Sequence, residues 1–209
     1  MDALNLTLLT AFIPTFFLVS ITPGLCMTLA LSLGITIGAR RALWMMAGEL
    51  VGVGLVATSA AVGVAAFMLK YPTAFIIFKY VGGIYLAWLG VQMWQSKGKL
   101  AMPEGELATA DTSRRQLAIQ GFVTAIANPK GWAFFVALLP PFIDGERPLA
   151  PQLSIMILII LTLEFCCLQI YAQGGRKLSQ ALRKGSGVKT ANRVAGSLMI
   201  LVGVWLALG

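Results

Sequence analysis

The chain has 209 residues, of which 58% are hydrophobic and only 11% are charged. A soluble domain carries roughly 25% charged residues, so this composition excludes a soluble globular enzyme, and its apolar content excludes a disordered chain. The net charge of +8 is interpreted as charge in cytoplasmic loops, and no nucleic-acid partner is expected.

Apolar segments recur along the whole chain, in near-continuous runs. Such runs are typical of membrane-spanning helices, whereas barrel strands alternate apolar and polar residues. Six spans of ~20 residues each would account for the hydrophobic content. The sequence therefore predicts an all-α polytopic membrane protein with six transmembrane helices in a lipid bilayer. In chain order the apolar segments are 6–38, 43–69, 73–95, 117–142, 152–173 and 192–208.

The basic residues predict the orientation of these spans. With six spans, both termini share a side with the loops around 70–79 and 143–151, and that side holds three Lys and Arg residues. The other side holds twelve. Because basic residues accumulate in cytoplasmic loops, we expect both termini outside the cytoplasm.

The two halves of the chain resemble each other. Residues 78–94 can be placed over 191–207 so that glycines seven residues apart coincide in both segments. A unit with an odd number of spans must insert twice in opposite senses, which gives the inverted repeats of many secondary transporters. A duplication without a role in transport is the alternative. The predicted first three-helix repeat, cytoplasmic linker and second three-helix repeat cover residues 1–95, 96–116 and 117–209.

Proline interrupts the first and fourth apolar segments at positions that the repeat brings into register. Thr and Asn are good N-caps and Pro is favoured at the first helical position, so we predict that both helices break at proline and restart. A restarted helix presents free N–H groups and a partial positive charge suited to a substrate carboxylate. Simple proline kinks are the alternative. The predicted substrate-binding residues of the two breaks are Thr22, Pro23, Gly24, Asn128, Pro129 and Lys130.

Charged residues inside the spans are the second signal, because charge at the bilayer centre is costly and usually functional. Glu164 lies in the middle of the fifth segment, and Glu49 lies in the second. Glu164 is predicted to bind a substrate ammonium or to carry a proton, although it could also neutralise Lys130. Glu49 is the second candidate for proton coupling. Tyr171 follows Glu164 by seven residues and could add a hydroxyl to the same helix face.

Several short motifs together resemble one known family. They are TPG in the first segment, ANPK in the fourth, YLAWLGVQMW in the third, ALLPPFI after the fourth and GSLMILVGVWLALG at the end. Over nearly the whole chain these motifs resemble the LysE/RhtB family of bacterial amino-acid exporters. The resemblance implies a multi-pass inner-membrane protein, not an enzyme, that needs no cofactor. It would export lysine, threonine, homoserine, homoserine lactone or a similar small amino acid by proton antiport.

The family pattern extends to individual residues. It includes both break motifs, with Gly24 after the first proline and Lys130 after the second, and an acidic residue at Glu164. Members often carry Pro or Ser where this chain has Leu25, and some carry an acid where it has Val53.

Competing functions depend on residues that are scarce here. A membrane thiol-redox protein of related architecture would need one cysteine in the first span and one in the fourth. The first span contains Cys26, but the fourth contains no cysteine. The sequence contains no histidine, which argues against metal transport. The GxxxG pairs at 34–38 and 48–52 allow close helix approach, within the chain or in a homodimer.

Overall fold

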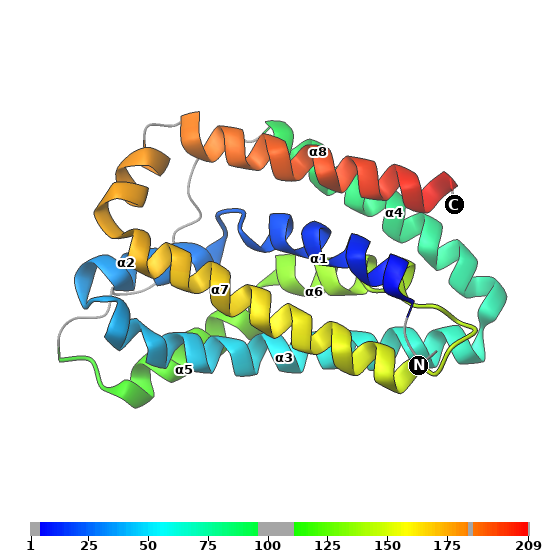
Figure 1. The fold of residues 1–209 in the computed structure, drawn as a ribbon, viewed down its shortest axis with the longest axis horizontal. Helices are drawn as coiled ribbons and strands as arrows, with labels where there is room; N and C mark the ends of the chain where they lie inside the picture. Colours follow the sequence, from blue (N-terminus) through cyan, green and yellow to red (C-terminus); the bar gives the residue numbers. More distant parts are fainter. Residues whose placement is uncertain (1–4, 96–110, 184–185, 209) are drawn as a thin grey trace.

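The computed structural model describes residues 5–95, 111–183 and 186–208. Within these ranges every regular element is helical, as the composition predicted, and no strand occurs (Figure 1). The elements are α1 (Leu6–Ser20), α2 (Leu25–Thr36), α3 (Ala39–Lys70), α4 (Pro72–Gln95), α5 (Arg114–Ile126), α6 (Pro129–Leu138), the 3₁₀ turn η1 (Pro140–Phe142), α7 (Leu149–Arg183) and α8 (Ser186–Leu208).

Length and composition qualify two of the described helices as membrane spans, over Ala39–Phe67 of α3 and Leu149–Gly175 of α7. The bent pair α1–α2 adds a third if it is counted as one span. The described helices thus provide two or three candidate spans, fewer than the six that the sequence predicted.

The second predicted break has the expected geometry. α5 ends at Ile126 and α6 begins at Pro129, so proline occupies the first helical position. The carbonyl of Asn128 accepts the N–H of Gly131 at 3.1 Å, which is the first bond of the new helix. Proline is favoured here because its missing N–H would have no partner inside the helix anyway.

The first break is present but is built differently from the prediction. α1 and α2 meet at a bend of 58°, and the N-cap of α2 is Gly24 in an extended conformation, without a side-chain cap. The predicted capping role of Thr22 is therefore wrong, because its hydroxyl donates to the Leu18 carbonyl at 2.8 Å. A residue before proline is disfavoured in the helical region, which helps to explain why the helix does not continue through Thr22 and Pro23 and restarts only at Leu25.

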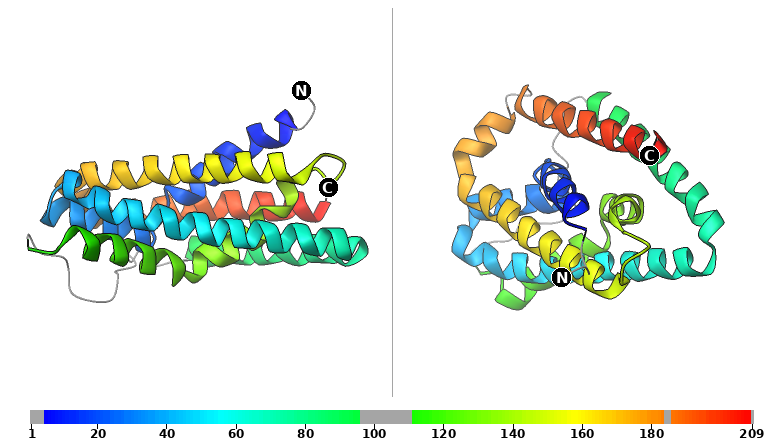
Figure 2. Two further views of the ribbon diagram at one scale, coloured as in Figure 1. Left: turned by 90° about the horizontal axis from the view of Figure 1, so that it is seen from below. Right: turned by 45° about the vertical axis from the view of Figure 1, so that its right-hand side comes forward.

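Helices at matching places in the two halves run in opposite directions. In Figure 1, α1–α2 runs against α5–α6, α3 against α7, and α4 against α8. α1 begins and α8 ends at the same end of the molecule. In the right-hand view of Figure 2, α1 and α6 lie inside a ring formed by the longer helices. The half-helices α1 and α6 thus lie between the longer helices, although some of their side chains, such as Leu6 and Trp132, are exposed.

Small residues allow the helices to approach closely. α4 and α8 cross at Gly90 and Gly196, where a Cβ on either glycine would clash with the carbonyl oxygen of the other. Gly48 packs in the same way on Ala118 of α5, and Gly34 packs on Ala172 of α7. Three of the four GxxxG glycines, Gly34, Gly48 and Gly52, therefore pack against other helices of the same chain, whereas a Cβ at Gly38 would meet nothing within 4 Å.

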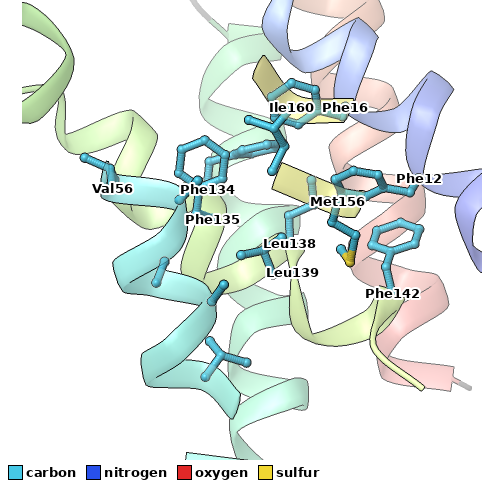
Figure 3. Packing of buried hydrophobic residues seen from close by; sticks show 14 of the residues in the cluster. Phe12, Phe16, Val56, Phe134, Phe135, Leu138, Leu139, Phe142, Met156 and Ile160 are labelled. Carbon is cyan, nitrogen blue, oxygen red and sulfur yellow. The ribbon is translucent and has the colours of Figure 1, made fainter. Parts of the chain in front are cut away.

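Buried apolar side chains form two separate clusters. The aromatic cluster lies toward the end where α1 begins, and Figure 3 shows its packing. The second cluster, called here the α2 cluster, lies around α2 and the facing parts of α3 and α7. The largest members of the aromatic cluster are Phe12, Phe16, Phe134, Phe135, Leu138, Leu139, Phe142, Met156 and Ile160. Those of the α2 cluster are Met27, Leu29, Leu33, Met45, Met46, Leu117, Leu168 and Tyr171.

The loop before α7 is tied to the start of α1. The side-chain amide of Asn5, the N-cap of α1, donates to a carboxylate oxygen of Asp144 at 3.1 Å. Arg147 Nε lies 3.0 Å from the same oxygen. The Asn5 hydrogen bond is the main reason that the pKa of Asp144 lies below its ordinary value. This contact joins the two halves of the chain at one end of the molecule.

α7 continues past the end predicted at residue 173 and runs to Arg183. Its path turns at Gly175, where φ is +48° and ψ is −136°. Glycine is suited to this position because φ in the left-handed region is costly for residues with a Cβ. The apolar pattern ended before the basic last turns of α7, so it could not predict them as helix.

Candidate functional site

A cavity of about 70 Å³ lies where the two helix breaks face each other. A volume of roughly 10–15 Å³ is enough for one water molecule, so this cavity has room for several water molecules or a small solute. Its polar lining side chains are Ser20, Thr22, Cys26, Glu49, Asn128 and Glu164. Its main apolar lining side chains are Phe16, Val19, Val53, Val56, Phe134 and Phe135.

Glu49 of α3 is the most unusual residue of this cavity. Its side chain is fully buried, and neither carboxylate oxygen has a hydrogen-bond partner. The groups that interact with it electrostatically are the Cys26 thiol and the Glu164 carboxylate. A buried polar group without a partner destabilises the fold by roughly 1–3 kcal/mol, and more if it is charged. Glu49 thus adds a buried carboxyl group to the cavity wall, next to the Cys26 thiol and the Glu164 carboxylate.

Glu164 of α7 also lines the cavity and, unlike Glu49, accepts a hydrogen bond from a side chain. The hydroxyl of Ser20, the last residue of α1, donates to its Oε2. Glu164 is half-buried, whereas Glu49 on the facing helix is completely enclosed. Two carboxylates from two helices therefore converge on one small space, which favours a bound cation or proton because like charges repel.

Both breaks present helix starts to the cavity. At α2, the first bond inside the helix runs from the Thr28 N–H to the Gly24 carbonyl at 2.9 Å, so the N–H groups before Thr28 have no partner in the helix. At α6, the Asn128 side-chain nitrogen lies 3.8 Å from the Cys26 sulfur. The two breaks therefore touch, and their partial positive charges favour an anionic group between them.

Comparison with known proteins supports a transport role for this geometry. A family model described as "LysE type translocator" matches residues 17–209, which include both breaks and both cavity carboxylates. The chain belongs to the LysE type translocator family. The resemblance drawn from the short motifs is thereby confirmed.

Three relatives of this LysE type translocator match over nearly their full lengths. A homoserine/homoserine lactone efflux protein of Salmonella typhimurium is 28% identical over 94% of both chains. A leucine efflux protein of Klebsiella pneumoniae is 27% identical over 97% of this chain and 93% of its own. An uncharacterized membrane protein of Vibrio cholerae is 28% identical over 94% and 95% of the two chains. No solved structure matches. The family, the relatives and the apolar helices together make the chain a membrane protein.

The structure of this translocator brings most of the predicted site residues together. The predicted site residues that line the cavity are Thr22, Gly24, Asn128, Glu49 and Glu164. Pro23 shapes the first break but does not line the cavity. For Pro129 and Lys130 the backbone is described as the first turn of α6, and their side chains lie outside the described part. The predicted pairing of Lys130 with Glu164 therefore stays a prediction.

Tyr171 of the translocator has a different position from the predicted one. It is buried in the α2 cluster, and its hydroxyl donates to the backbone carbonyl of Ile21 at 2.8 Å. Ile21 caps the end of α1. Tyr171 thus supports the first break from outside the cavity lining.

Sequence reasoning about this translocator missed Ser20 and the aromatic wall of the cavity. Ser20 ends α1 just before the break, and a hydroxyl at that point was the available signal. Phe134 and Phe135 follow the second break by about two turns but resembled ordinary core residues. The thiol-redox alternative finds no support, because the Cys26 sulfur contacts an amide and α5 and α6 contain no cysteine.

Proposed function

We propose that this translocator is a secondary active exporter of a small amino acid, driven by proton antiport across the bacterial inner membrane. The family and the names of the efflux relatives support an exporter. The observation that carries the proposal is the cavity, which is lined by residues of two helix starts and by two carboxylates. A zwitterionic amino acid has complementary charges for both kinds of group.

The substrate carboxylate binds between the two breaks in this proposal. The N-terminus of α2 at Gly24 and the Asn128 amide both line the cavity, and both favour an anion. Thr22 completes this wall, with Pro23 and Pro129 keeping the helix ends open. Lys130 follows Pro129 in the first turn of α6 and belongs to the same proposed substrate site.

Glu164 couples substrate and proton in this proposal. The substrate ammonium takes its place between Glu164 and Glu49, and a proton occupies the same carboxylates when the substrate has left. The half-buried position of Glu164 and its bond from Ser20 allow exchange with both. Glu49, enclosed and unpartnered, provides the second charge that holds the ammonium.

Alternating access then uses the two apolar clusters as barriers. The cavity lies between the aromatic cluster and the α2 cluster, so opening one of them would connect the site to one side of the membrane. We propose two inverted repeats of three spans each, residues 1–95 and 117–209, with 96–116 as a cytoplasmic linker. The antiparallel pairs of matching helices support this arrangement (Figure 1).

The test is transport in proteoliposomes, with wild type and Glu164→Gln compared under an imposed pH gradient. Wild type should export an amino acid faster with the gradient than without it. The glutamine variant keeps the shape but cannot carry the proton, so gradient-driven export should fall at least about tenfold. Glu146→Gln, in the exposed loop before α7, is the matched control and should behave as wild type. Gradient-driven export by Glu164→Gln would exclude Glu164 as the coupling residue.

A further inference from the structure

The polarity of the cavity changes along α3. Glu49, Val53 and Val56 are spaced by four and three residues, so they lie on one helix face, and all three line the cavity. The carboxylate is at the start of this stripe, and the two valines continue it toward the end of the molecule where α1 begins. One wall is therefore polar at one end and apolar at the other.

The other walls have the same polarity. On α1 the lining runs from Ser20 back to Phe16, and from the second break it runs from Asn128 forward to Phe135. α3 and α6 run toward the end of the molecule where α1 begins, and α1 runs away from it (Figure 1). Going backward along α1 and forward along α6 therefore leads in the same direction as going from Glu49 to Val56 on α3. Three independent elements thus place polar groups at the breaks and apolar groups beyond them.

The apolar end is closed by aromatic rings. The Phe16 ring centroid lies 5.8 Å from that of Phe134 and 6.2 Å from that of Phe135. Figure 3 shows these rings together with Val56 in the aromatic cluster. The lining residues that the structure describes at this end carry no side-chain donor or acceptor. A polar group placed here would lose its water without gaining a partner.

We propose that the substrate class of this site is neutral amino acids with short aliphatic side chains. This inference rests on the proposed function and specifies it. The ammonium and carboxylate bind at the break end, which leaves the substrate side chain against Val53, Val56 and Phe16. A hydroxyl or ammonium on that side chain would be left unpaired in an apolar pocket. An apolar pocket discriminates against an added hydroxyl by up to about a hundredfold.

The test compares norvaline with homoserine, which differ only in a terminal methyl or hydroxyl group. Exchange of each labelled amino acid against internal unlabelled substrate is measured in proteoliposomes with no pH gradient. We expect wild type to prefer norvaline about tenfold or more in initial rate per concentration. Val53→Thr places a hydroxyl at the apolar end without a change of shape and should reduce this preference severalfold. Val51→Thr, on the outer face of α3 with 62% of Val51 exposed, should leave it unchanged.

The outcomes separate this inference from the proposed function. Equal or better exchange of homoserine by wild type would overturn the substrate class and leave the exporter intact. An unchanged preference in Val53→Thr would overturn the position of the side chain, and Val56→Thr repeats the test if the first variant does not fold. Absence of exchange with norvaline, homoserine, lysine and every other amino acid would overturn the proposed function itself.

Discussion

Glu49 lowers the stability of the folded protein, because burial of an unpaired carboxyl group is unfavourable. It is fully buried, has no hydrogen-bond partner for either oxygen, and faces a second carboxylate across the cavity. The next two α3 residues that line the cavity, Val53 and Val56, are apolar. A buried polar group without a partner is expected where a ligand supplies the missing hydrogen bond or charge. The protein is then less stable when the ligand is absent.

Replacement of Glu49 by methionine should therefore raise stability and abolish amino-acid exchange. Methionine is similar in length and removes an unpaired polar group worth roughly 1–3 kcal/mol. For a protein of this size each kcal/mol corresponds to about 2–4 °C in Tm, so a rise of several degrees in detergent is expected. Glu146→Met in the exposed loop should change neither Tm nor exchange. A lower Tm for Glu49→Met would show that the carboxylate has a structural partner.

At the level of single residues, the sequence predicted both cavity carboxylates because charges in apolar segments are rare. It also predicted Asn128, which has the capping position expected for it. It misplaced Tyr171 and the cap of α2, because hydrogen bonds to Ile21 and Leu18 depend on how helices pack and on the exact end of α1. Periodicity alone contains neither kind of information.

At the level of elements, the two breaks differ in what holds them open. The break before α2 depends on the extended Gly24 as well as on proline. At the break before α6, Ala127 already has helical backbone angles (φ −77°, ψ −5°), and proline directly begins the next helix. The second break therefore depends more strongly on its proline than the first.

Pro129→Ala should accordingly impair transport more than Pro23→Ala. Alanine restores the N–H and the helical preference, so α5 and α6 can join and remove the helix start from the cavity. Substrate exchange in proteoliposomes should be lost in Pro129→Ala, while Pro23→Ala should retain a measurable fraction of the wild-type rate. Circular dichroism of both purified variants serves as the folding control. Equal loss in the two variants would contradict the asymmetry.

The apolar pattern predicted every described long helix, to within a few residues at most ends. It failed at the starts of α3, α5 and α8 and at the end of α7, where basic residues belong to helices but interrupt the apolar runs. These residues include Arg40, Arg114, Lys177 and Lys189. It did not predict where the long helices cross, because the contact between Gly90 and Gly196 depends on the path of the intervening chain. Composition identifies segments, but their arrangement follows from packing.

At the scale of the whole molecule, α1 begins and α8 ends together, and most described basic residues lie at the opposite end. This distribution leads to a prediction of topology, with both termini outside the cytoplasm. Alkaline phosphatase fused after residue 209 should be active and a fluorescent protein at the same position dark. A fluorescent protein inserted within residues 96–116 should be bright. The reverse pattern would overturn the orientation.

Two consecutive residues at the end of α1 are fastened to the same helix. Ser20 donates to Glu164, and the Ile21 carbonyl accepts the Tyr171 hydroxyl, so the two bonds lie seven residues apart on α7. These two bonds hold the end of α1 at two points along α7, which opposes both rotation and sliding of α1 against α7. In the proposed transport cycle, a substrate ammonium that draws Glu164 away from Ser20 would break the first of these bonds and leave the bond from Tyr171 in place. Ligand binding would thereby change a rigid joint into a hinge.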